Sequence, residues 1–186
     1  MLLFVGLGNP TPNSQNNRHN IGFKIIDAIN QKYSLSKQKP KFKGLLTTGN
    51  IGDKKVYAIK PLTFMNNSGI CIRELLEYFK IDAEDVIVFH DDLDVDVGKI
   101  KTKFGGSSAG HNGVASIDKF IGKDYSRVRV GIGKPEKKIS VSDHVLNDFN
   151  EDEEEELSKL TINIIESLTI LLDKKLDLFS SVVNNK

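Results

Sequence analysis

The spacing of apolar residues in the first part of the chain predicts a strand followed by a helix. Residues 2–5 are a short apolar run leading into GLGNP, a pattern typical of a buried strand that ends in a sharp loop. The apolar positions that then recur at helical spacing are Gly22, Ile25, Ile26, Ile29 and Tyr33. They predict a helix over residues 20–33, with Asn16, Asn17 and Asn20 as candidate caps.

The next segment predicts a loop, a hairpin and a second helix. Residues 34–43, SLSKQKPKFK, are polar and basic and predict a loop. Strand-like runs on either side of IGDKK predict a hairpin within residues 44–61. The polar loop LTFMNNSG follows, in which Asn66, Asn67 and Ser68 are candidate caps. The helix after it is predicted by the spacing of Ile72, Leu75, Leu76 and Phe79.

The strongest strand signal is DVIVFHDDLD. Residues 86–89 are continuously apolar, as in a central strand covered on both faces, and the run stops at His90 and the carboxylates of Asp91, Asp92 and Asp94. In GKIKTKF the lysines alternate with other residues, so Lys99, Lys101 and Lys103 are expected on one face of a strand. A glycine-rich loop, GGSSAGHNG, a helix in VASIDKFIG and a last strand in SRVRVGIGKP complete this region.

Residues 150–183 predict one long amphipathic helix whose acidic run lies near its start, where carboxylates suit the positive end of the helix dipole. Strands and helices alternate before it, which indicates a single α/β domain over residues 1–186. We expect a twisted, mixed and largely parallel sheet flanked by helices. Functional residues of such folds gather where strands end in loops.

Composition narrows the class of protein. The net charge is +1, so no field over the whole molecule indicates a nucleic-acid partner. The distribution is uneven, however: residues 95–139 hold ten Lys or Arg against four Asp or Glu, and residues 141–186 hold eleven acidic against four basic. With Cys71 as the single cysteine, no disulfide framework is possible and a cytoplasmic location is expected. We read the N-terminal apolar run as a strand, not a signal, and expect no membrane association.

Three familiar chemistries fit the sequence poorly. The pattern G-x-S-x-G around Ser108 suggests a serine hydrolase, but beyond its loop only His144 could be the base, and the adjacent Asp143 is poorly placed to orient it. GLGNPT lacks the third glycine of a dinucleotide loop, with Thr11 in its place. HDDLD has no partner cysteines or His-x-x-x-His pair, so we expect no metal. Cys71 reads as a small apolar residue of a helix.

A histidine base without a nucleophilic side chain remains. An imidazole has an ordinary pKa near 6.5, so His19 in NNRHNIG is suited to act as a base at cellular pH. Asp91 is the candidate carboxylate that would fix its tautomer. Asn9, Asn66 and Asn112 lie in loops and could bind an amide or polarise a carbonyl.

Several stretches together resemble the bacterial-type peptidyl-tRNA hydrolase family. They are GLGNP, RHNIG, PLTFMNNSG, HDDLD, GGSSAGHNG and RVRVGIGKP, and they occur in the family's order and spacing over nearly the whole chain. The resemblance implies hydrolysis of the ester between a peptide and the terminal ribose of tRNA, which recycles tRNA. It also implies a monomer that needs no metal or cofactor.

The resemblance also implies roles for individual residues. His19 matches the general base, Asp91 the acid that holds it, and Asn9 the residue that separates blocked from unblocked aminoacyl-tRNA. The positions that match substrate or tRNA contacts are Phe64, Met65, Asn66, His111, Asn112 and Ser14. Residues that could cradle phosphates are Lys99, Lys101, Lys103, Arg127, Arg129 and Lys134.

Two departures from the family pattern put one contact in doubt. The family usually has glycine after GNP and a tyrosine three positions later, where this chain has Thr11 and Ser14. Ser14 cannot stack on a base or a ribose, so the tRNA contact of that tyrosine is doubtful here. Two other functions stay open from the sequence: a serine esterase acting through Ser108, and an RNA-binding module without catalytic activity.

Overall fold

The apolar runs predicted as strands pair side by side and form the parallel centre of a sheet. The computed structural model describes all 186 residues and contains one seven-stranded sheet with the order β2-β3-β4-β1-β5-β7-β6. Strands β4, β1, β5 and β7 are parallel neighbours, whereas β2 and β3 on one side and β6 on the other are antiparallel. The strands are β1 (Leu2–Gly6), β2 (Lys39–Lys41), β3 (Gly44–Ile51), β4 (Lys54–Pro61), β5 (Val86–Asp92), β6 (Ile100–Phe104) and β7 (Ser126–Gly131).

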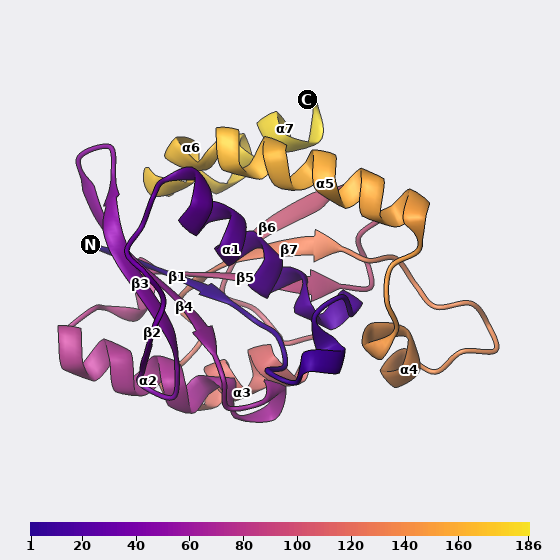
Figure 1. Cartoon of the computed structure of the whole chain (residues 1–186), viewed down its shortest axis with the longest axis horizontal. Coiled ribbons are helices and arrows are strands. Elements are labelled where there is room, and N and C mark those ends of the chain that lie inside the picture. Colours follow the sequence, from indigo (N-terminus) through magenta and orange to yellow (C-terminus); the bar gives the residue numbers. More distant parts are fainter.

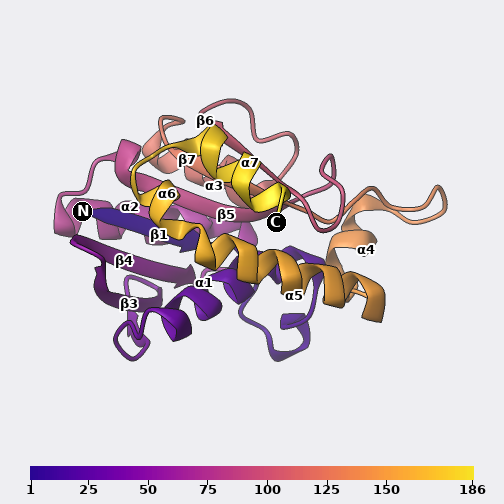
Figure 2. The ribbon, with the colours of Figure 1, turned by 90° about the horizontal axis from the view of Figure 1, so that it is seen from above.

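Helices cover both faces of this sheet, as the α/β prediction required (Figure 1). They are α1 (Ile21–Lys32), α2 (Ser68–Phe79), α3 (Asn112–Ile121), α4 (Val141–Leu146), α5 (Glu151–Glu166), α6 (Leu168–Leu172) and α7 (Leu176–Asn184). Helices α2 and α3 lie below the sheet in Figure 1, and α1, α5 and α6 lie above it. Seen from above, α5 runs beside α1 (Figure 2). None of the helices combines the length and the apolar character that crossing a bilayer requires.

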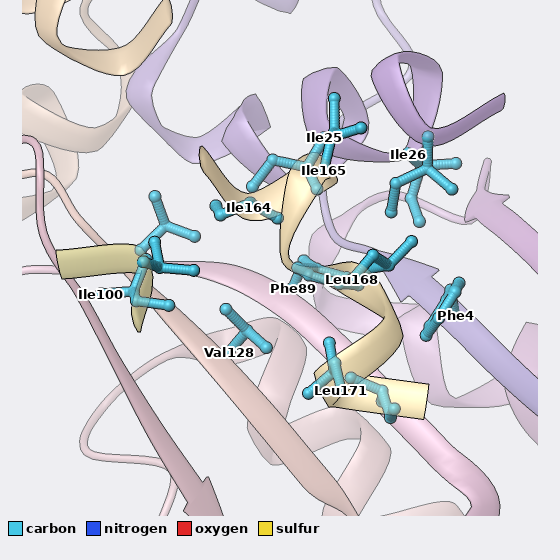
Figure 3. Packing of buried hydrophobic residues seen from close by; sticks show 14 of the residues in the cluster. Phe4, Ile25, Ile26, Phe89, Ile100, Val128, Ile164, Ile165, Leu168 and Leu171 are labelled. Atoms are coloured by element: carbon cyan, nitrogen blue, oxygen red, sulfur yellow. The ribbon is translucent and has the colours of Figure 1, made fainter. Parts of the chain in front are cut away.

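Strand β1 shows how a continuous apolar run serves two cores. Phe4 belongs to the core under α1 and α5, whereas Leu3 and Val5 belong to the core against α2 and α3, because successive side chains point to opposite faces. Strand β5 divides in the same way, with Phe89 on the first face and Val88 on the second. Figure 3 shows Phe4 and Phe89 packed beneath α1 and the C-terminal helices. The prediction of a central strand covered on both faces is confirmed.

Helix α1 packs unusually close to the sheet because two glycines face each other. A Cβ atom on Gly22 would lie 2.4 Å from the backbone nitrogen of Leu7 and 2.4 Å from the carbonyl oxygen of Phe89. A Cβ atom on Gly6 would lie 2.3 Å from the carbonyl oxygen of Gly22. This contact sets the height of α1 above β1 and β5, and with it the position of the residues just before α1.

The C-terminal segment corrects one prediction. We expected one long helix over residues 150–183, and the structure has three, α5, α6 and α7. The chain turns at Ser167 and again at Lys174, which has a left-handed φ of 58°. The turns bring Leu171 and Phe179 into the same core, which a straight helix could not reach. The start of α5 is as predicted, with a capping box between Asn150 and Glu153.

The two edges of the sheet are protected in different ways. The predicted loop over residues 34–43 contains the short edge strand β2, whose sequence Lys-Pro-Lys is fully exposed and blunts that edge. The opposite edge strand, β6, is covered by α7. There the Asn184 amide accepts from the backbone nitrogen of Ile100 and donates to its carbonyl oxygen, at 2.9 and 2.8 Å.

Replacing Gly22 with alanine should destabilise the fold, because a methyl group would collide with backbone atoms on β1 and β5. We expect a loss of about 1–3 kcal/mol or more in the free energy of unfolding, despite alanine's better helix propensity. Denaturant unfolding would measure it. In the control Gly49→Ala, the new Cβ meets only the Leu35 residue, most closely the end of its side chain. A cost there as large as at Gly22 would contradict the close-packing argument.

Candidate active site

The carboxyl ends of the parallel strands open into one cavity of about 890 Å³. The loops after β1, β4 and β5, the turn before α1 and the start of α3 all contribute to it. The predicted site residues that line it are Asn9, Ser14, His19, Phe64, Met65, Asn66, Asp91, His111, Asn112 and Lys134. Residues separated by up to 125 positions in sequence therefore share one surface.

His19 and Asp91 form the centre of the cavity. His19 lies in a 3₁₀ turn (Arg18–Asn20) directly before α1, and Asp91 lies near the end of β5. The His19 Nδ1 atom is 2.9 Å from both carboxylate oxygens of Asp91. The Asp91 side chain is only 3% exposed, whereas His19 lines the cavity. The ring is therefore held from behind while its other edge faces open space.

The charge state of Asp91 sets the tautomer of His19. Burial by itself raises the pKa of the Asp91 carboxyl, but the imidazoles of His111 and His19 outweigh burial and hold that pKa well below its usual range. An ionised carboxylate only accepts hydrogen bonds, so His19 Nδ1 must carry the proton that is shared with Asp91. His19 Nε2 then keeps its lone pair and has no hydrogen-bond partner within the protein.

His111 also contacts Asp91, with Nε2 at 2.8 Å from Oδ1. Its Nδ1 accepts from the backbone nitrogens of Gly113 and Val114, at 3.1 and 3.3 Å, and so caps α3. A nitrogen that accepts carries no proton, so the proton of a neutral His111 is on Nε2 and points at Asp91.

This tautomer bears on metal binding. His19, Asp91 and His111 bring one donor atom each within 4.8 Å of one another, and these are donor types that transition metals use. A metal would need the lone pair of His111 Nε2, however. The proton would then have to move to Nδ1, where it would face the two backbone N–H groups of α3. The arrangement favours a hydrogen-bonded triad over a metal centre.

Asn9 is held in place by Asn20, which the sequence had not indicated as part of the site. The Asn20 side chain accepts from the backbone nitrogen of Asn9 and donates to its carbonyl oxygen, both at 2.9 Å. We had considered Asn20 as a helix cap, but its side chain makes no capping bond. The Asn9 side-chain oxygen accepts from the backbone nitrogen of Met65 at 2.9 Å. The Nδ2 group of Asn9 is thus left as a free donor.

Asn66 and Asn112 flank the cavity with exposed side chains that form no hydrogen bond within the protein. Beside them Phe64 is 55% exposed and has a φ of 60°, a backbone conformation that is costly for an aromatic residue. Strain combined with an exposed aromatic ring is typical of a binding site. Met65 next to it is buried.

One wall of the cavity is apolar and was not predicted. It is formed by Leu93 after β5 and by Val141, Val145 and Leu146 of α4. Val141 and Leu146 are about half exposed, and the helix is too short for its apolar spacing to stand out in the sequence. Ser14, at the rim, is 8% exposed and its hydroxyl pairs with Thr11, which leaves it little capacity for a tRNA contact.

The basic residues separate into surface and buried groups. Lys101 and Lys103 are exposed on β6, but Lys99 precedes the strand and donates to the carbonyl oxygen of Asn184. Arg129 pairs with Asp92 at 2.8 Å and is partly exposed.

The prediction that Arg127 contacts phosphate is wrong. Its guanidinium is 3% exposed and bonds the carbonyl oxygens of Gly106 and Ser107 and the carboxylate of Asp118. It therefore anchors the glycine-rich loop.

Arg18 has a related role beside His19. It donates to the carbonyl oxygen of His144 in α4 at 3.2 Å and pairs with Glu153 of α5 at 2.9 Å. These contacts tie the 3₁₀ turn that carries His19 to both helices. No local signal in the sequence indicates them, because their partners lie more than 120 residues away.

The geometry around Ser108 does not support a serine nucleophile. A nucleophile elbow is a tight turn from strand to helix, whereas β6 ends at Phe104 and α3 begins only at Asn112. No histidine bonds the Ser108 hydroxyl, and His144 is directed to the carbonyl oxygens of Ile132 and Gly133.

His90 should make the fold sensitive to acid. Burial lowers the pKa of His90 to about 3, with His111 as a second cause. Folded His90 stays neutral down to that pH, while the unfolded chain binds a proton below about pH 6.5, so stability falls as pH falls through this window. We expect a slope of up to about 1.4 kcal/mol per pH unit between about pH 6 and pH 4, measured by denaturant unfolding. His90→Asn should remove this part of the slope; equal slopes would contradict the assignment.

Comparisons with known proteins agree with the geometry. Residues 3–186 match the family model described as peptidyl-tRNA hydrolase. The chain is 80% identical to a peptidyl-tRNA hydrolase of Pelagibacter ubique over the full length of both, and 44% identical to that of Bartonella henselae over 99% of this chain and 95% of the relative. A crystal structure of peptidyl-tRNA hydrolase from Acinetobacter baumannii is 34% identical, covers 99% of this chain and 94% of its own, and superposes with a TM-score of 0.92. The chain belongs to the peptidyl-tRNA hydrolase family.

Proposed function

We propose that this protein hydrolyses the ester joining a peptide, or another N-blocked aminoacyl group, to the 3′-terminal ribose of tRNA, and so recycles tRNA. Family membership supports the reaction class. The observation that carries the proposal is the bond from His19 Nδ1 to both oxygens of buried Asp91, with the Nε2 lone pair left free at the cavity. The free Nε2 atom faces the cavity, and no serine, threonine or cysteine side chain hydrogen-bonds to His19.

The reaction follows from the proton positions. His19 Nε2 removes a proton from a water molecule as the water oxygen bonds to the ester carbonyl carbon. The imidazolium that forms is stabilised by Asp91. The carbon–oxygen bond to the ribose then breaks, and the proton passes from Nε2 to the departing ribose oxygen. The products are a free carboxylic acid and tRNA with an intact 3′ hydroxyl, so all atoms balance.

The amides beside the base would stabilise the intermediate. Asn66 and Asn112 have side-chain donors that no protein group uses, and both line the cavity. A neutral amide can donate to an oxyanion without adding a charge that would disturb the base. An ester activated by a ribose is labile. A general base that accelerates the reaction by a factor of about 10²–10⁴, with oxyanion donors that give a similar factor, is sufficient without a metal.

Asn9 provides a basis for choosing N-blocked substrates. Its Oδ1 is occupied by the backbone nitrogen of Met65, so it offers only Nδ2 as a donor. A blocked amino group brings an amide carbonyl that can accept from this donor, whereas a free ammonium group brings only donors. The two-way bond from Asn20 fixes Asn9 in this orientation.

The rest of the cavity fits the two halves of the substrate. The apolar wall of Leu93, Val145 and Leu146 can take side chains of the peptide. Exposed Phe64 can stack on a base or ribose of the CCA end. Exposed Lys101 and Lys103, with Lys134 at the cavity and partly exposed Arg129, can contact phosphates of the acceptor stem.

His19→Ala should lower the turnover of N-acetyl-aminoacyl-tRNA by about 10²–10⁴ while leaving tRNA affinity nearly unchanged, because the base is lost but the binding surface is not. The wild-type rate should fall in acid, because a protonated imidazole cannot act as a base. Release of the N-acetylated aminoacyl group measures both. Ser108→Ala is the control and should retain turnover. Survival of turnover in His19→Ala, or its loss in Ser108→Ala, would reject the histidine base.

Replacing Lys103 or Lys101 with alanine should weaken tRNA binding mainly at low salt. Each lost phosphate contact should lower the slope of log affinity against log salt by about 0.9 for a duplex stem. The measurement is tRNA binding to the His19→Ala protein over a salt series. Lys159→Ala, on the acidic helix α5, is the matched control and should leave the slope unchanged. If the slopes with Lys101→Ala and Lys103→Ala equal those of the control and of the parent protein, the phosphates bind elsewhere.

A further inference from the structure

Asp91 is bound by two imidazoles, and the role of the second is open. His19 Nδ1 lies 2.9 Å from both carboxylate oxygens, and His111 Nε2 lies 2.8 Å from Oδ1. The two rings are neighbours, with centroids 4.9 Å apart. The buried carboxylate of Asp91 therefore binds two histidines. His19 has a free ring nitrogen that can act on substrate, whereas both ring nitrogens of His111 bond to protein groups.

His111 is committed because both of its ring nitrogens are occupied. Nδ1 accepts from the backbone nitrogens of Gly113 and Val114, and Nε2–H donates to Asp91. A second proton on Nδ1 would break the cap and place a cation at the positive end of the α3 dipole. In this arrangement neither ring nitrogen of His111 is left for a hydrogen bond to substrate. His111 lines the cavity, and its predicted contact with substrate stays a prediction.

We propose that His111 is a positioning residue that aims Asp91 at His19 and takes up part of the negative charge of Asp91, so that Asp91 holds a proton on His19 less firmly than it would without the second bond. The proposal rests on the proposed role of His19 as the base. Without the His111 bond, the buried carboxylate would direct its whole charge at His19. The imidazolium would then be held more firmly, and the base would be protonated at higher pH.

No other charged group around the cavity takes the place of His111 as a partner of Asp91. Asp92 is paired with Arg129 at 2.8 Å, and Asp94 lies 3.6 Å from Lys134. His90 packs against His111 with centroids 4.9 Å apart, but burial lowers the pKa of His90 to about 3, so it is neutral wherever the enzyme would work. The groups in direct contact with Asp91 from the cavity side are the two imidazoles.

His111→Asn tests the proposal. Asparagine keeps the cap of α3 but is too short to hold Asp91 as well. We expect the acid limb of log kcat/KM against pH to move to higher pH by about half a unit to one unit. The loss of rate should be larger at pH 6 than at pH 8, with KM for N-acetyl-aminoacyl-tRNA little changed. His111→Ala, which also loses the cap, should show the same limb shift together with lower stability.

Nuclear magnetic resonance of the ring nitrogens gives a readout that does not depend on activity. In the wild-type protein, His111 Nδ1 should be unprotonated, and the midpoint of the His19 titration should rise in His111→Asn. An unmoved midpoint and acid limb, or a proton on His111 Nδ1, would overturn the proposal. A rise in KM alone would return His111 to substrate binding. These results are distinct from failure of the base assignment, which is decided by turnover of His19→Ala.

Discussion

The site depends on one buried interaction, the carboxylate of Asp91 holding the Nδ1–H of His19. The attraction between this carboxylate and a positive charge on His19 is stronger than it would be on the surface, because water is largely excluded and opposite charges are less screened. Burial alone would favour the neutral acid, so the neighbouring imidazoles are needed to keep Asp91 ionised. The tautomer of His19 and the direction of its free Nε2 atom therefore follow from a single carboxylate.

The fold supplies the precision that this interaction requires. Asp91 belongs to a buried central strand, and His19 precedes the helix that two glycines allow to pack directly against β1 and β5. Arg18 fixes the turn that carries His19 to α4 and α5, and Asn20 in the same turn fixes Asn9. Residues 18–20 and the end of β5 thus hold both His19, the proposed base, and Asn9, the residue proposed to select N-blocked substrates.

Local pattern predicted the elements better than it predicted the contacts between them. The apolar run of β5 and the helical spacing of α1 are strong signals, and the polar residues that follow strand ends did meet in one cavity. The breaks at Ser167 and Lys174 contain no glycine or proline, so only packing against the sheet reveals them. Arg127 and Lys99 look like free surface charges in sequence, because their partners are carbonyl oxygens that no sequence pattern marks.

The way in which α7 covers β6 has a consequence for the order of events during synthesis. Asn184, 84 positions further along the chain, completes the hydrogen bonding of Ile100, so β6 is an open edge until α7 has been made. Until α7 has emerged and docked, that strand can pair with a neighbouring nascent chain. The topology therefore leaves β6 open to misassembly until α7 has been synthesised and has docked.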